Sequence, residues 1–172
     1  MSIFIFSRPV RSGKTTELQH CCNEINAVGI LMPDIDGSRK IFNIKTKEIF
    51  DIECKDPANT KKTLQAVGQY HFYNESFEKA NAILMEASAS NSGWLIIDET
   101  GKLELQSLGL YEATKKIIEN KEYHTGYKNL LLVVRDSLYK QVISFFNIPA
   151  HTLIHDLNGI TLSAVKDPDS GK

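Results

Sequence analysis

Two short apolar runs, each followed by a polar motif, constrain the fold of this 172-residue chain more than any other feature. The first run, residues 3–6, precedes the sequence Ser-Gly-Lys-Thr-Thr at residues 12–16. The second run, residues 94–97, ends in Asp98 and Glu99. Buried strands that end in a glycine-lysine-threonine turn or in paired acids are typical of sheets whose strand ends surround a phosphate group. We therefore expect a strand, a phosphate-binding loop and a helix at the start of the chain.

The other apolar patterns predict strands that alternate with helices. Apolar residues between Leu18 and Ile25 are spaced as on one helix face, and we expect that helix to end near Gly29. Similar patterns predict helices over residues 74–87, 108–121 and 138–146 and buried strands over residues 94–97 and 130–134. This alternation favours an α/β fold with a mainly parallel sheet that helices cover on both faces.

Residues 41–54 carry a different pattern, in which apolar and polar residues alternate on both sides of a polar turn at residues 45–48. This pattern predicts a β-hairpin that is inserted as an antiparallel addition to the main sheet. The chain has 42% hydrophobic and 24% charged residues, which is ordinary for a globular protein of this length. We expect residues 1–172 to form a single domain.

Composition also excludes several classes of partner. A net charge of -1 provides no general attraction for nucleic acid or for an acidic membrane. Apolar runs are too short to span a bilayer, and the first residues lack the pattern of a secretory signal. The three cysteines form no disulfide framework, and two of them are the neighbours Cys21 and Cys22. We expect a cytoplasmic protein with reduced thiols, and no motif identifies a protein partner.

The segment after the first strand has the chemistry of a phosphate-binding loop, or Walker A motif. Successive backbone N–H groups at a helix start bind an anion, and Lys14 neutralises the outer phosphates. Gly13 lets the main chain approach the ligand, and the Thr15 hydroxyl is placed to ligate Mg²⁺. The residues expected to bind the phosphates of a nucleoside triphosphate are Arg8, Pro9, Val10, Arg11, Ser12, Gly13, Lys14, Thr15 and Thr16.

Asp98 and Glu99 have the pattern of a Walker B motif at the carboxyl end of a strand. In this position Asp98 holds a water molecule on Mg²⁺, while Glu99 orients or deprotonates an attacking water. Arg135 follows the strand of residues 130–134 and is expected at the same edge, either as an internal arginine finger or in a surface salt bridge. Lys102 has an auxiliary or structural role. The candidate catalytic residues are Lys14, Glu99 and Arg135, and the candidate metal ligands are Thr15 and Asp98.

The sequence of residues 95–105, Leu-Ile-Ile-Asp-Glu-Thr-Gly-Lys-Leu-Glu-Leu, resembles the acidic motif of a small family of P-loop nucleoside triphosphatases. That family is typified by a thermostable enzyme and a vertebrate cancer-related counterpart, and the similarity covers nearly the whole chain. The resemblance implies a RecA-like sheet and magnesium-dependent hydrolysis of nucleoside triphosphates to diphosphates, with broad base tolerance. It also implies phosphate, magnesium, magnesium-water and general-base roles for Lys14, Thr15, Asp98 and Glu99 respectively.

The loop departs from that family at Arg8 and Arg11, where the family usually has glycines. A guanidinium group at either position would clamp a phosphate oxygen, or else crowd the phosphates. Two other functions therefore stay open beside hydrolysis. One is a nucleotide-binding switch or interaction module with weak or no hydrolysis, and the other is a small-molecule or nucleotide kinase.

Overall fold

The structure is a computed structural model that describes residues 2–119, 127–148, 150–158 and 160. The strands of its main sheet are β1 (Ser2–Arg8), β2 (Ala27–Leu31), β3 (Asp34–Ile35), β4 (Ser38–Asn43), β5 (Ile49–Asp51), β9 (Ser92–Thr100), β10 (Tyr127–Arg135) and β11 (Thr152–Ile154). Their order in the described part is β11-β1-β10-β9-β2-β4-β3, with β5 paired to β4. The strands from β11 to β2 are parallel, and β3, β4 and β5 pair in antiparallel fashion. The expectation of a mainly parallel sheet is confirmed.

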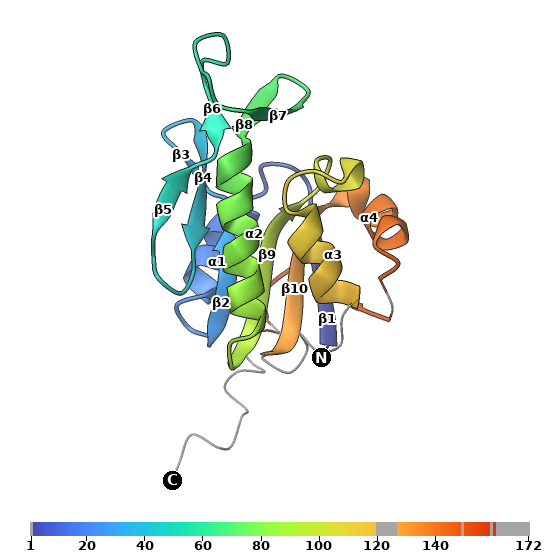
Figure 1. Cartoon of the computed structure of the whole chain (residues 1–172). Helices are drawn as coiled ribbons and strands as arrows, with labels where there is room; N and C mark the ends of the chain where they lie inside the picture. The colour runs from blue at the N-terminus through green and yellow to red at the C-terminus, as the bar shows by residue number, and fades with distance from the viewer. Residues whose placement is uncertain (1, 120–126, 149, 159, 161–172) are drawn as a thin grey trace.

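Helices cover both faces of this sheet (Figure 1). They are α1 (Lys14–Cys21), α2 (Asn74–Ser88), α3 (Tyr111–Glu119) and α4 (Tyr139–Phe145), with short 3-10 turns η1 (Glu104–Gln106) and η3 (Asp136–Leu138). The helix expected over 108–121 begins at Tyr111, and residues 120 and 121 lie outside the described part. None of the described helices has both the length and the apolar character needed to cross a bilayer.

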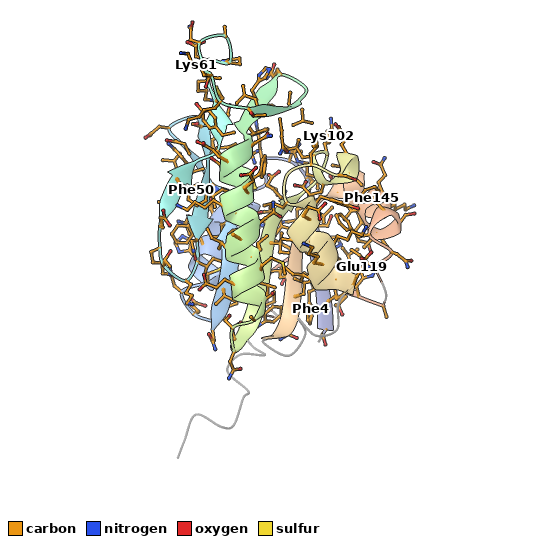
Figure 2. The ribbon with its side chains drawn as sticks, viewed as in Figure 1. Phe4, Phe50, Lys61, Lys102, Glu119 and Phe145 are labelled. Atoms are coloured by element: carbon orange, nitrogen blue, oxygen red, sulfur yellow. The ribbon has the colours of Figure 1, made fainter. Side chains whose placement is uncertain are left out.

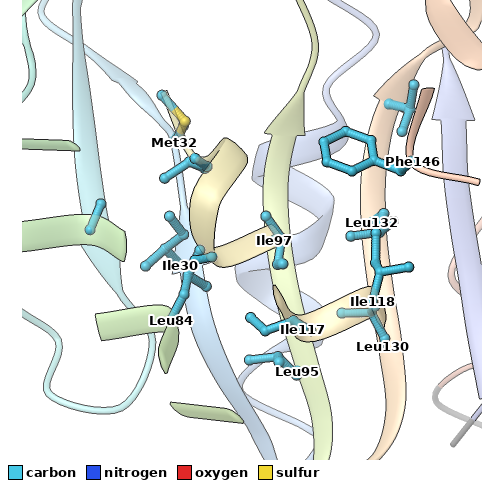
Figure 3. Close-up of a cluster of buried hydrophobic side chains, with 14 of the residues drawn as sticks. Ile30, Met32, Leu84, Leu95, Ile97, Ile117, Ile118, Leu130, Leu132 and Phe146 are labelled. Atoms are coloured by element: carbon cyan, nitrogen blue, oxygen red, sulfur yellow. The ribbon is translucent and has the colours of Figure 1, made fainter. Parts of the chain in front are cut away.

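Alternation along the strands divides the core into two layers. Leu95 and Ile97 of β9 pack in the layer under α2 and α3, together with Leu84 and Ile117 (Figure 3). Ile96 and Trp94, which is two residues before it, belong to the layer that contains Leu18 and Cys21 of α1. Because side chains alternate along a strand, the residue after Ile97 faces α1. That residue is Asp98, so the sheet itself directs this carboxylate toward the first helix.

Directly after Ile97, the pairing of β9 with β10 is interrupted by a bulge. Ile97 pairs with Leu132 and Thr100 pairs with Val134, so that two residues of β9, 98 and 99, lie opposite one residue of β10. The bulge places Glu99 in the left-handed region, with a φ of 66°. Bulges bend a strand and change the direction of its side chains. The bulge therefore sets the directions in which the two acids leave the strand end.

The expected end of the first helix was wrong. The helix stops at Cys21, where a turn closed by the Ile25 N–H and the Cys21 carbonyl leads into β2, and Gly29 lies within that strand. Gly29 has a φ of 113°, and a Cβ atom there would lie 2.1 Å from the Ile96 carbonyl oxygen. The glycine permits a close approach of two strands. It does not end a helix.

The expected hairpin is present, because Ile41 of β4 lies opposite Phe50 of β5. Cys54, which was expected to belong to it, lies instead in a second sheet. That sheet has the order β6-β8-β7 and consists of β6 (Glu53–Cys54), β7 (Leu64–Val67) and β8 (Tyr70–Tyr73). This second sheet lies at one end of α2 (Figure 1). Lys61 and Lys102 both lie at this end of the molecule, whereas Phe4 lies toward the other end (Figure 2).

Candidate active site

A cavity of about 970 Å³ opens at the edge where the parallel strands end. Parallel register brings these ends together, since Arg8 of β1 lies opposite Arg135 of β10, and Val134 lies opposite Thr100 of β9. The cavity is lined by the loop residues 10–16, by Glu99 and Arg135, and by residues of the second sheet. Candidate residues that are distant in sequence therefore share one cavity.

The loop before α1 has the backbone conformation that its glycine allows. Gly13 has a φ of 80°, and its carbonyl accepts the Glu17 N–H at 3.0 Å as α1 begins. Nothing lies within 4 Å of a Cβ atom placed on Gly13, so the backbone conformation, and not space, selects glycine here. The first N–H groups of a helix have no partner within it, and residues 13–16 at the start of α1 line the cavity, where the helix dipole favours an anion.

Lys14 is the first residue of α1 and is only 9% exposed. Its Nζ donates hydrogen bonds to the carbonyl oxygens of Pro9 at 2.8 Å and Arg8 at 3.1 Å. Burial lowers the pKa of Lys14, although the nearby carboxylates of Glu99 and Asp98 act in the opposite direction. The loop thus holds an ammonium group beside the two acids.

Arg8 and Arg11 differ in their relation to the cavity. Arg8 has strand conformation, and its guanidinium pairs with Glu17 and lies 4.8 Å from the centre of the Phe6 ring. Arg8 and Pro9 are absent from the described cavity lining and contribute carbonyl oxygens to Lys14. Arg11 lines the cavity with an exposed side chain and has a φ of 60°, a conformation that costs a non-glycine residue about 1–2 kcal/mol. Of these two arginines, only Arg11 lines the cavity.

Asp98 and Thr15 form the meeting point of the two motifs. The Thr15 hydroxyl donates to Asp98 Oδ2 at 2.9 Å, and the Met32 N–H donates to the same oxygen at 3.0 Å. Asp98 is 1% exposed, and its Oδ1 has no hydrogen-bond partner within the described part of the chain. A buried carboxylate oxygen without a partner, next to a threonine hydroxyl, suits the oxygen ligands that Mg²⁺ prefers. Thr15 and Asp98 therefore fit the Mg²⁺ ion that the sequence analysis implied.

The electrostatics of Asp98 support this fit. Burial, reinforced by the negative charge of Glu99, raises the pKa of Asp98 to about 6, although the hydrogen bonds from Met32 and Thr15 oppose this. A bound cation would favour the ionised form of such a carboxylate. The raised pKa of Asp98 is therefore compatible with a cation site at this carboxylate.

Glu99 lies between two guanidinium groups. Its Oε1 is 3.0 Å from Arg39 Nη1, and its Oε2 is 3.1 Å from Arg135 Nη2. Burial acts to raise the pKa of Glu99, but Arg39 and Arg135 outweigh it and hold that pKa below its usual value. Glu99 is thus an ionised carboxylate. Among the described residues, Arg135 forms its ion pair with Glu99 at the cavity, and not with a residue elsewhere on the surface.

Arg39 was not predicted from the sequence. It lies on β4 of the inserted hairpin, between Ser38 and Lys40, and these polar residues form no recognisable motif. Lys102, which was expected in an auxiliary role, also lines the cavity. No motif signals Arg39, since its relation to Glu99 arises only when β4 is placed beside β2.

Comparisons with known proteins agree with this architecture. A family model described as NTPase matches residues 2–150. The crystal structure of THEP1 from the hyperthermophile Aquifex aeolicus is similar, with a TM-score of 0.67, 22% identity and coverage of 96% of both chains. The solution structure of a human cancer-related nucleoside triphosphatase has a TM-score of 0.60 and 20% identity, and the match covers 99% of this chain and 98% of the other. No curated protein matches the chain.

Proposed function

Because this chain belongs to the NTPase family, whose model matches residues 2–150, we propose that it hydrolyses nucleoside triphosphates to diphosphates and phosphate in a magnesium-dependent reaction. The observation that carries the proposal is the convergence of Lys14, Thr15 and Asp98, joined by the hydrogen bond between Thr15 and Asp98 at 2.9 Å. A phosphate-binding loop that shares a cavity with Glu99 and a hydrogen bond with Asp98 supplies the parts that such hydrolysis needs.

The loop of residues 8–16 binds the phosphates in this proposal. The backbone N–H groups at the start of α1 hold the inner phosphates, and Lys14 neutralises the outer ones. The carbonyl oxygens of Arg8 and Pro9 hold the Lys14 ammonium in the cavity until the phosphate replaces them. Arg11 adds positive charge at the cavity wall.

Thr15 and Asp98 would hold Mg²⁺, Thr15 through its hydroxyl and Asp98 through Oδ1, directly or across a water molecule. When bound, the ion supplies positive charge to the oxygens of the β- and γ-phosphates. Asp98 is fixed for this role by the Met32 N–H, which orients the carboxylate without neutralising it.

Glu99 acts as the general base that receives a proton from the attacking water. It is ionised, and its carboxylate lies at the cavity wall, where Arg135 also lies. Arg135 and Lys14 would stabilise the negative charge on the transferring phosphoryl group. Water is the nucleophile in this reaction, so no side chain forms a covalent intermediate.

A kinase is a second candidate, because the cavity of about 970 Å³ is also lined by Gln69 and Tyr70 of the second sheet's hairpin. An acceptor with a hydroxyl group would bind in this same cavity. A nucleotide-binding switch with weak hydrolysis is a third candidate, favoured by Arg11, a non-glycine residue that has a φ of 60° in the phosphate-binding loop. Neither needs a different phosphate site.

We further propose that the protein acts as one domain in the cytoplasm. All three cysteines are free and buried, which suits a reducing compartment.

A phosphate-release assay tests the proposal across several nucleoside triphosphates, with Mg²⁺ or with a chelator, and without any acceptor. We expect release that needs Mg²⁺ and falls by about 100-fold in Lys14→Ala. Lys116→Ala, at an exposed position on α3, serves as the control and keeps the wild-type rate. Diphosphate formed only after an acceptor is added, with the phosphoryl group recovered on the acceptor and no free phosphate, would identify a kinase. Tight binding in calorimetry without any turnover would identify a switch.

A further inference from the structure

Arg39 and Arg135 contact Glu99 from two different parts of the sheet. Arg135 ends β10, beside β9 in the parallel core, whereas Arg39 lies on β4, which pairs with β2 on the other side of β9. Each guanidinium contacts its own oxygen of the Glu99 carboxylate, at 3.0 Å for Arg39 and 3.1 Å for Arg135. The carboxylate is therefore held at both oxygens.

The main chain at Arg39 is fixed from both sides. Its N–H donates to Glu53 Oε2 at 2.9 Å, its carbonyl accepts the Ile52 N–H at 3.4 Å, and Asp34 lies opposite it on β3. Glu53 is itself buried, and its other oxygen pairs with Lys55 at 2.6 Å. Arg39 thus reaches Glu99 from a rigid base, so that its guanidinium has a defined position.

Glu99 needs such support. Its backbone has a φ of 66° in the bulge of β9, a region that costs a non-glycine residue on the order of 1–3 kcal/mol and persists only when the surroundings hold it. Charge-assisted hydrogen bonds to guanidinium groups are directional and strong. The pair with Arg39 fixes the side of the carboxylate that Arg135 does not contact.

We propose that Arg39 is a positioning residue, which holds the Glu99 carboxylate in the orientation that activates water, so that the inserted hairpin completes the active site. This inference rests on the proposed function, because it requires Glu99 to act as the base. Arg39 acts through Glu99, and its loss should lower turnover more than nucleotide affinity. Misplacing a catalytic group by about 1 Å costs on the order of 100-fold in rate.

The first test compares Arg39→Gln, Arg39→Lys and the control Lys40→Gln. Lys40 is the next residue on β4 and pairs with Asp51, away from the cavity lining described for this chain. We expect Arg39→Gln to lower kcat by about 10- to 100-fold with KM and the dissociation constant changed by less than about threefold. Arg39→Lys should recover part of the rate, and Lys40→Gln should match the wild type. An unchanged kcat in Arg39→Gln, or an equal loss in Lys40→Gln, would overturn the inference.

The second test repeats Arg39→Gln in the Glu99→Gln background under single-turnover conditions. A residue that acts through Glu99 adds no further loss there, whereas a residue that only supports the fold, or that contacts phosphate by itself, lowers the residual rate by the same factor in both backgrounds. Guanidinium ion added to Arg39→Ala should restore activity, since it occupies the vacated space. Equal losses in both backgrounds, or no recovery with guanidinium, count against the inference.

The two proposals fail in different ways. If Glu99→Gln itself keeps the wild-type rate, Glu99 is not the base and the proposed mechanism fails. If Glu99→Gln loses activity while Arg39→Gln keeps it, the mechanism stands and only the role of Arg39 is wrong.

Discussion

Thr15 and Asp98 are joined by a hydrogen bond of 2.9 Å that connects the first turn of α1 with the carboxyl end of β9. The contact forms because Asp98, two residues after Ile96, lies on the strand face that α1 covers. It leaves the second oxygen of Asp98 buried and without a partner among the described residues. In the proposed function, this buried oxygen and the Thr15 hydroxyl are the groups that would hold Mg²⁺.

Acid should weaken magnesium-dependent nucleotide binding. The pKa of Asp98 is raised to about 6, and its ionised form is the one that holds a cation. We expect the affinity for a triphosphate with Mg²⁺, measured by calorimetry, to fall by about fourfold more in the wild type than in Asp98→Asn when the pH is lowered from about 7.5 to about 5.5. Parallel pH dependence in the two proteins would show that Asp98 does not titrate in binding.

Glu104 should make stability depend on pH. It is 3% exposed, and burial raises its pKa from the ordinary value of 4.5 to about 7, despite N–H donors from Leu110 and Gly101. Between these values the folded state binds more protons than the unfolded state, so the contribution of Glu104 to the free energy of unfolding decreases as pH rises. Urea unfolding from about pH 5 to about pH 8 should show a shallower decrease in Glu104→Gln than in the wild type. Identical slopes would contradict the assignment.

Gly29→Ala should destabilise the fold strongly. The added Cβ atom would lie 2.1 Å from the Ile96 carbonyl oxygen, within the pairing of β2 and β9. We expect a loss of about 3 kcal/mol or more in the free energy of unfolding. Gly37→Ala is the matched control, because Gly37 has a φ of 70° but no atom within 4 Å of the added Cβ, and it should cost only about 1 kcal/mol. Equal losses would show that the close approach is unimportant.

Arg11→Gly separates the two possible roles of the Arg11 side chain. Glycine accepts a φ of 60° without strain but makes the unfolded chain more flexible, so we expect the free energy of unfolding to change by less than about 1 kcal/mol. If the guanidinium binds phosphate, calorimetry should show about two- to fivefold weaker triphosphate binding, as for an exposed ion pair, and Arg11→Lys should keep most of the affinity. Tighter binding in Arg11→Gly would mean that Arg11 crowds the phosphates.

Part of this fold can be predicted from local patterns in the sequence. The apolar runs before Gly13 and Asp98 predict parallel strands, and parallel strands end at one edge, so the meeting of the two motifs is predictable. The second sheet was missed, although Gly68 and Gln69 form a two-residue turn between Val67 and Tyr70 that favours a hairpin.

Other features depend on contacts that no local pattern contains. The left-handed conformation of Glu99 depends on the bulge between β9 and β10, which is a property of two strands. The contact of Arg39 with Glu99 depends on how the inserted hairpin pairs with β2. Gly29 was misread as a helix end because its close neighbour, Ile96, is distant in sequence.

The most direct test of the account measures phosphate release and triphosphate binding in Glu99→Gln, which keeps the shape of the side chain and removes its basicity. The account predicts binding as tight as in the wild type, or tighter because Arg39 and Arg135 lose their carboxylate partner, with turnover reduced by at least about 100-fold. Phosphate release at the wild-type rate in this variant would contradict the central claim that Glu99 activates the attacking water.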